Sequence, residues 1–129
     1  LLTLERVERL AGDLVMVMEL ADRNLADRFD ECVAAGLRGV PRDELLGYLA
    51  DAAEALDLMS ARHGLQHLDV KPANLFLVGD RAKVGDYGLV RAVAAGDAEK
   101  RGLTPRYVAP EVLHGRVHAH SDQYSLALV

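Results

Sequence analysis

The sequence has a single cysteine, Cys32, among its 129 residues. An internal disulfide is therefore excluded, and the chain fits a reducing compartment, the cytoplasm. A catalytic thiol is disfavoured because no histidine that could activate Cys32 lies nearby in the sequence. Its place in a helical pattern predicts a small packed residue instead.

Long hydrophobic runs and basic clusters are also lacking. The longest apolar run, residues 14–18, is far shorter than the roughly 20 residues that cross a bilayer. The formal net charge is −5 and no basic block stands out. We therefore expect no nucleic-acid partner and no membrane segment in this chain. With 50% hydrophobic and 27% charged residues, the composition is that of a globular chain.

One loop concentrates groups that suit phosphoryl transfer, in which proteins mainly position groups and stabilise charge. It runs from His67 to Asn74. Asp69 is suited to accept a hydroxyl proton, and Lys71 to neutralise a transferring phosphoryl group. Asn74 can hold a divalent cation through its amide oxygen. Asp86, twelve residues further on in a Gly-Asp-Tyr-Gly segment, offers a second metal ligand.

The histidines near the C-terminal end form an alternative cluster: His114, His118 and His120. His-x-His spacing can bind a transition metal. No cysteine lies near, and a solvated loop explains the three residues without a metal. We therefore do not assign a metal site to them.

Periodicity predicts strands and helices over the first half of the chain. Residues 4–10 and 14–18 are expected to be strands joined by a tight turn at Gly12–Asp13. A short helix is predicted over 24–35, and its apolar side is expected to carry Leu25, Phe29, Cys32 and Val33. A longer helix is predicted from Pro41, in its first turn, to a left-handed cap at Gly64. Its core stripe is Leu45, Leu49, Ala52, Leu56 and Met59.

In the second half, a hairpin of residues 75–78 and 82–84 is expected to place Asp86 beside Asn74, as two metal ligands require. A short helix is predicted from Pro110. Ser121 is expected to cap a last helix that continues to the end of the chain.

Three motifs together resemble those of the protein kinase family. His67, Asp69 and Asn74 have the spacing of its catalytic loop. Asp86-Tyr87-Gly88 and then Ala109-Pro110-Glu111 follow in the family's order. One match would be weak, but three in order make chance matching very unlikely. The chain is identified as resembling a eukaryotic-like Ser/Thr protein kinase of the bacterial type.

The resemblance implies an α+β, protein-kinase-like fold, of which the chain is a fragment. Residues 1–18 would be the last small-lobe strands, 19–22 the hinge, and 23–129 an incomplete large lobe up to the start of its central helix. The glycine-rich loop, the strand lysine and the helix glutamate of the family are not in the sequence. The fragment alone is therefore expected to bind ATP poorly and to turn over nothing measurable.

The resemblance also assigns roles and cofactors, ATP and Mg²⁺. The residues implied in ATP binding are Met18 as gatekeeper, Glu19 and Ala21 in the hinge, Phe76 as the floor of the adenine pocket, and Lys71, Asn74 and Asp86 at the phosphates and metal. Asp69 and Lys71 would be catalytic, and Thr104 would lie in the segment that faces a protein substrate. His67, Tyr87, Glu111 and Asp122 would be structural, with Asp122 holding the backbone of the catalytic loop. The partner arginine of Glu111 is missing, so this carboxylate is expected to be unpaired.

Two residues depart from the family pattern. Tyr87 replaces phenylalanine and keeps an aromatic ring. Leu68 stands where most kinases carry arginine, which pairs with a phosphate on the activation segment. That segment, residues 89–103, contains no serine, threonine or tyrosine. We therefore expect activity that does not depend on phosphorylation there.

The function implied is ATP-dependent phosphorylation of Ser or Thr on protein substrates. Lys71, two residues after Asp69, together with Thr104 favours Ser/Thr over Tyr. One alternative is a small-molecule phosphotransferase of related fold, against which Lys71–Pro72 and residues 104–111 argue. Another is a pseudokinase that acts as a binding or scaffolding module, against which the intact Asp69 and Asp86 argue.

Overall fold

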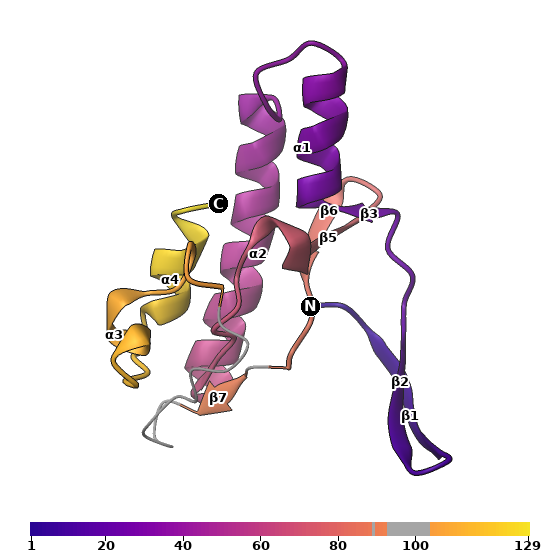
Figure 1. The fold of residues 1–129 in the computed structure, drawn as a ribbon, viewed down its shortest axis with the longest axis vertical. Helices are drawn as coiled ribbons and strands as arrows, with labels where there is room; N and C mark the ends of the chain where they lie inside the picture. The colour runs from indigo at the N-terminus through magenta and orange to yellow at the C-terminus, as the bar shows by residue number, and fades with distance from the viewer. Residues whose placement is uncertain (89, 93–103) are drawn as a thin grey trace.

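The computed structural model describes residues 1–88, 90–92 and 104–129. In chain order its elements are β1 (Leu4–Leu10), β2 (Asp13–Met18), β3 (Arg23–Asn24), α1 (Leu25–Ala34), α2 (Arg42–His63), β4 (Leu65–Gln66), the 3-10 helix η1 (Pro72–Asn74), β5 (Leu75–Val78), β6 (Arg81–Val84), β7 (Arg91–Ala92), α3 (Pro110–Leu113) and α4 (Ser121–Leu126). Figure 1 shows a body built along α2, from which the β1–β2 hairpin projects on extended connections. This mixture of helices and strands agrees with the predicted α+β class. Within the described residues, no helix is long and apolar enough to cross a membrane.

The N-terminal hairpin is antiparallel, with Leu10 opposite Asp13. Ala11 and Gly12 form its turn, and both have positive φ, 52° and 98°. Such two-residue turns match the right-handed twist of the strands they join. The two predicted strands are confirmed, and the turn begins one residue earlier than predicted.

Local signals set the ends of the two longer helices. At the start of α1, Asn24 Oδ1 accepts the backbone N–H of Asp27, and the Asp27 carboxylate accepts the N–H of Asn24, both at 3.0 Å. Pro41 is the N-cap of α2, one residue before the predicted first-turn position. Gly64 closes α2 in the predicted left-handed conformation, with φ 61°.

The apolar faces of these helices are buried only in part. In α2, Ala52, Leu56 and Met59 are buried as predicted, while Leu45 and Leu49 are half-buried. In α1, Leu25 and Cys32 are buried, but Phe29 and Val33 are each 48% exposed. The predicted helix is confirmed, but its apolar side is only partly buried, and α1 packs chiefly against η1 and the short strands β3 and β5.

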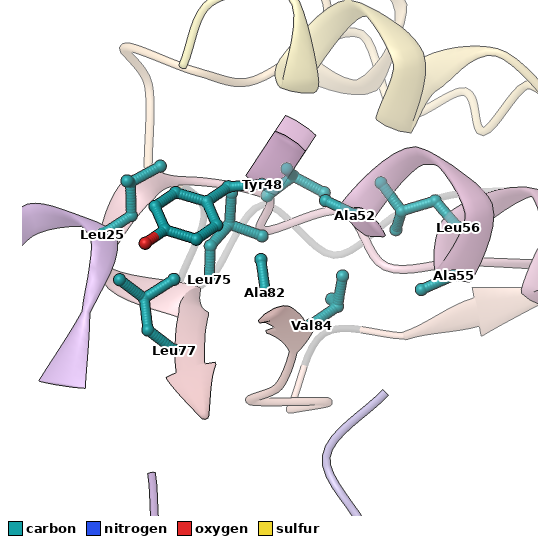
Figure 2. Packing of buried hydrophobic residues seen from close by; sticks show 10 residues of the cluster. Leu25, Tyr48, Ala52, Ala55, Leu56, Leu75, Leu77, Ala82 and Val84 are labelled. Atoms are coloured by element: carbon teal, nitrogen blue, oxygen red, sulfur yellow. The ribbon is translucent and has the colours of Figure 1, made fainter. Parts of the chain in front are cut away.

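The core lies between α2 and a three-stranded antiparallel sheet of order β3-β5-β6. Figure 2 shows side chains of α2 pointing toward those of the strands. The cluster consists of Leu25, Tyr48, Ala52, Ala55, Leu56, Val70, Leu75, Leu77, Ala82 and Val84. The β5–β6 hairpin is confirmed, with Leu75 opposite Val84. It brings the segment after β6 next to the loop before β5, where the motifs lie.

Two strand pairings between distant segments involve strands that the sequence did not predict, namely β3, β4 and β7. β3 pairs with β5, and β4 pairs with β7 through Leu65 and Ala92. The second pairing attaches the start of the predicted activation segment next to His67. Leu89 and residues 93–103 of that segment lie outside the described residues.

The C-terminal part packs through a second apolar cluster, Leu68, Val108, Ala109, Val112 and Val117. The predicted start of α3 at Pro110 is confirmed. The predicted cap of α4 is wrong: the N-cap is His120, and Ser121 lies in the first turn. The Ser121 hydroxyl instead accepts the backbone N–H of His118 at 3.1 Å.

Candidate active site

His67 anchors the loop between β4 and η1 through both ring nitrogens. Nδ1 accepts the backbone N–H of Asp69 at 3.3 Å, and Nε2 lies 3.0 Å from the carbonyl oxygen of Gly85. A nitrogen that faces an N–H must be unprotonated, and one that faces a carbonyl must carry the proton. The ring is therefore neutral, in agreement with its burial, which lowers the pKa of His67.

Asp122 of α4 holds the backbone of the same loop. Its Oδ2 accepts the N–H of His67 at 2.6 Å, and its Oδ1 accepts the N–H of Leu68 at 2.8 Å. Leu68 has a positive φ of 66°, which a leucine adopts only where the surroundings impose it. Burial raises the pKa of Asp122. The contact that the resemblance implied for Asp122 is present.

Asp69 is buried and surrounded by polar side chains from its own loop and from Thr104. Its Oδ2 accepts from Lys71 Nζ at 2.7 Å and from Asn74 Nδ2 at 2.8 Å. Its Oδ1 accepts the hydroxyl of Thr104 at 2.9 Å. Lys71 Nζ also donates to Thr104 Oγ1 at 3.0 Å. The structure thus brings together four predicted site residues that span 35 positions, with a carboxylate and an ammonium group at the centre.

Asn74 and Asp86 are the residues predicted to hold the metal. The backbone N–H of Gly85 donates to the carbonyl of Asn74 at 3.1 Å, which brings the two segments together. Asn74 Nδ2 is bonded to Asp69, so its amide oxygen is the end left for a cation. Asp86 is exposed, and its φ of 63° is imposed on a non-glycine residue. An amide oxygen and a carboxylate are hard donors of the kind Mg²⁺ prefers, so these residues fit the ion.

The structure, in the residues it describes, does not assemble His114, His118 and His120 into a metal-binding group. The part of the chain that the structure describes contains no group of three or more His, Cys, Asp or Glu that could hold a metal ion. His114 Nδ1 lies 2.7 Å from the carbonyl of Pro110, one turn earlier along the chain.

A hollow of about 530 Å³ lies at the base of the β1–β2 hairpin. It is lined by Leu2, Met16, Met18, Glu19, Leu20, Ala21, Arg23, Asn24, Asp27, Phe76, Asp86, Tyr87 and Gly88. Five of the residues predicted to bind ATP line it: Met18, Glu19, Ala21, Phe76 and Asp86. Lys71 and Asn74, also predicted to bind ATP, do not. Its lining is largely apolar and also contains three carboxylates and the guanidinium of Arg23. Apolar walls with a few polar groups suit a flat aromatic base attached to charged groups.

Tyr87 and His67 meet next to this hollow. Their ring centroids are 5.6 Å apart at an interplanar angle of 65°, an edge-to-face contact. The Tyr87 hydroxyl donates to the carbonyl of Val84. Burial raises the pKa of Tyr87. The substituted aromatic ring therefore packs against the catalytic loop and also has a partner for its hydroxyl.

Glu111 forms no ion pair within the described residues, but its carboxylate has a hydrogen-bond donor. Its Oε1 accepts the hydroxyl of Ser121 at 2.8 Å. Because Asp122 follows Ser121, α4 contacts both Glu111 and the loop from His67 to Asn74. The sequence did not predict the hydrogen bond from Ser121 to Glu111, because a serine at the start of a helix is typical of an N-cap.

Comparison with known proteins gives the same family. The model of the protein kinase domain matches residues 1–129. The serine/threonine-protein kinase PknB of Mycobacterium leprae is 38% identical over 96 residues, which cover 70% of this chain and 15% of that protein. Eukaryotic translation initiation factor 2-alpha kinase 3 of Bos taurus is 34% identical over 104 residues, 68% of this chain and 9% of that protein.

A third relative covers more of the chain. The membrane-associated tyrosine- and threonine-specific cdc2-inhibitory kinase wee-1.3 of Caenorhabditis elegans is 32% identical over 127 residues, 91% of this chain and 17% of that protein. The aligned chain thus spans less than a fifth of each of these three relatives. Since the family model matches every residue of it, the chain belongs to the protein kinase domain family.

Proposed function

We propose that the protein containing this chain transfers the γ-phosphoryl group of ATP to serine or threonine hydroxyls of protein substrates, with Mg²⁺. The observation that carries the proposal is the arrangement of Asp69, Lys71 and Thr104, in which a carboxylate and an ammonium group share one hydroxyl. A substrate hydroxyl that takes up the same pair of contacts would meet an acceptor for its proton and a cation for the phosphoryl group.

Each residue then has one role. Asp69 accepts the proton of the attacking hydroxyl, and Lys71 stabilises the charge of the transferring group. Asn74 and Asp86 would hold Mg²⁺, which neutralises charge on the phosphates. Met18, Glu19, Ala21 and Phe76 line the hollow that would take the adenine.

The preference for serine or threonine has support from relatives and from the site. PknB is named a serine/threonine kinase, whereas wee-1.3 is named tyrosine- and threonine-specific, so the family alone does not decide it. The bond between Lys71 and Thr104, the two residues by which the chain resembles Ser/Thr kinases, supports the small hydroxyls. We also place the protein in the cytoplasm, on the evidence of its single, buried cysteine.

The test compares two variants of an active protein that contains this chain. Asp69→Asn and Asp86→Asn should each lower turnover of a Ser/Thr peptide by at least about 100-fold. Asp86→Asn should also weaken Mg²⁺-dependent ATP binding, whereas Asp69→Asn should leave it largely intact. Asp80→Asn, in the exposed β5–β6 turn, is the matched control and should change neither.

The other candidate functions give different results. Near wild-type activity in both variants would refute the site assignment. ATP binding by the wild type without transfer to any peptide would instead indicate a scaffolding pseudokinase. Transfer to small molecules but not to peptides would indicate the small-molecule phosphotransferase.

A further inference from the structure

Glu19 and Lys83, 64 positions apart, form an ion pair at the base of the β1–β2 hairpin. Lys83 Nζ donates to both carboxylate oxygens, at 2.8 and 2.7 Å. The side chains are only 21% and 29% exposed, respectively. Glu19 Oε1 also accepts the backbone N–H of Thr3 at 2.6 Å, and the N–H of Glu19 donates to the carbonyl of Thr3 at 3.0 Å. The Glu19 carboxylate, directly after β2, therefore contacts both Thr3, directly before β1, and Lys83 on β6.

The position of this pair connects two sides of the proposed nucleotide site. Glu19 lines the hollow directly after β2. Lys83 lies on β6, three residues before Asp86, which lines the same hollow. A backbone bond from the N–H of Leu2 to the carbonyl of Val84, 2.9 Å long, runs beside the pair. The hairpin projects from the body in Figure 1, so its orientation over the hollow depends on these few contacts at its base.

The Glu19 carboxylate is ionised at neutral pH. The hydrogen bonds from Lys83 and from the backbone of Thr3 lower the pKa of Glu19 to about 2. Loss of the ammonium group would leave a half-buried carboxylate with one backbone donor, and the carboxylate would then turn toward water.

We propose that Lys83 is a positioning residue for nucleotide binding: through Glu19 it fixes the hairpin and residues 19–21 at the distance from Asp86 that ATP requires. Lys83 itself does not touch the nucleotide. It lines a different hollow, on the α2 side of β6. The inference rests on the proposed function, because it assumes that the 530 Å³ hollow takes ATP.

The experiment uses an active protein that contains this chain and substitutes Lys83→Met. The Michaelis constant for ATP should rise about three- to tenfold, while kcat at saturating ATP and the Michaelis constant for the peptide should stay within about twofold. Arg81→Met is the matched control: Arg81 is on the same strand and pairs with Asp51 of α2 at 2.6 Å, away from the hinge. It should leave the Michaelis constant for ATP unchanged.

Charge reversal tests whether the pair itself acts. Glu19→Lys and Lys83→Glu should each raise the Michaelis constant for ATP, and the double variant should restore most of the affinity. Hydrogen exchange should become faster at the amides of Thr3 and Glu19 in Lys83→Met and not in Arg81→Met. An unchanged Michaelis constant in Lys83→Met, or no recovery in the double variant, overturns the inference.

ATP-binding measurements separate failure of the proposed function from failure of this inference. If the wild type does not bind ATP with Mg²⁺, as measured by equilibrium dialysis, the hollow is no nucleotide site and the proposed function fails. If the wild type binds ATP and Lys83→Met binds it equally well, only the positioning role of Lys83 is overturned.

Discussion

Replacing Asp122 by asparagine should destabilise the fold by about 2 kcal/mol, because the site needs two acceptors and asparagine has one. Both carboxylate oxygens are occupied, by the N–H groups of His67 and Leu68 at 2.6 and 2.8 Å. Whichever way the new amide turns, its NH₂ group faces one of these backbone donors. The loop that carries Asp69 then loses half of its attachment to α4.

Two opposing effects set the size of the free-energy cost of Asp122→Asn. A hydrogen bond to a charged group contributes about 1.5–3 kcal/mol, and a buried donor left without an acceptor costs about 1–3 kcal/mol. Burial raises the pKa of Asp122, so removal of the charge recovers part of the desolvation cost. The loss outweighs the recovery because one bond disappears and the other becomes a bond to a neutral oxygen. A net cost of about 2 kcal/mol is a large fraction of the roughly 5–15 kcal/mol that stabilise a typical domain.

Urea unfolding followed by circular dichroism measures this cost, and the melting temperature should fall by roughly 4–10 °C. Asp22→Asn is the matched control, since Asp22 Oδ2 also accepts a backbone N–H, that of Gly79 at 2.8 Å, but at an exposed position. Its cost should stay below about 1 kcal/mol. If Asp122→Asn costs no more than the control, the two-acceptor argument is refuted.

Three further predictions concern single residues. Burial lowers the pKa of His67, so its neutral ring stabilises the fold above the unfolded pKa of about 6.5. This stability is lost as pH falls through the lowered pKa. The difference in unfolding free energy between wild type and His67→Asn should therefore become smaller from about pH 8 to about pH 5. Since Leu68 is buried in an apolar cluster and residues 89–103 lack a hydroxyl group, phosphatase treatment should leave the activity of the containing protein unchanged. A required phosphate found by mass spectrometry between Asp86 and Glu111 would contradict this. Asn24→Ala, which breaks the capping box of α1, should cost about 1 kcal/mol in the same urea experiment, and Asn24→Ser should recover most of it.

The elements whose signals are local could be predicted from the sequence. The β1–β2 hairpin, α2 up to Gly64, and the β5–β6 hairpin follow from apolar periodicity and from residues that tolerate turns and caps. These preferences act over a few neighbouring residues, so they survive without knowledge of the remaining chain. Motif spacing likewise identified the family and named Asp69, Lys71, Asn74 and Thr104 before their contacts were seen.

Contacts between residues from distant segments depend on the packing of the folded chain and could not be predicted. The two-residue strands β3, β4 and β7 have no periodicity of their own and exist because partners lie beside them. Phe29 and Val33 match an apolar helix face, yet each remains 48% exposed, because burial depends on which elements pack against that face.

The same holds for the charged contacts around the site. Nothing near Glu19 in the sequence points to Lys83, and nothing near Glu111 distinguishes Ser121 from an ordinary cap. Such pairs depend on how α4 and β6 pack against the rest of the chain. The sequence therefore determined which groups are available for chemistry, whereas packing decided which of them are close enough to act together, because contact energies fall off within a few ångströms and chain separation carries no information about that distance.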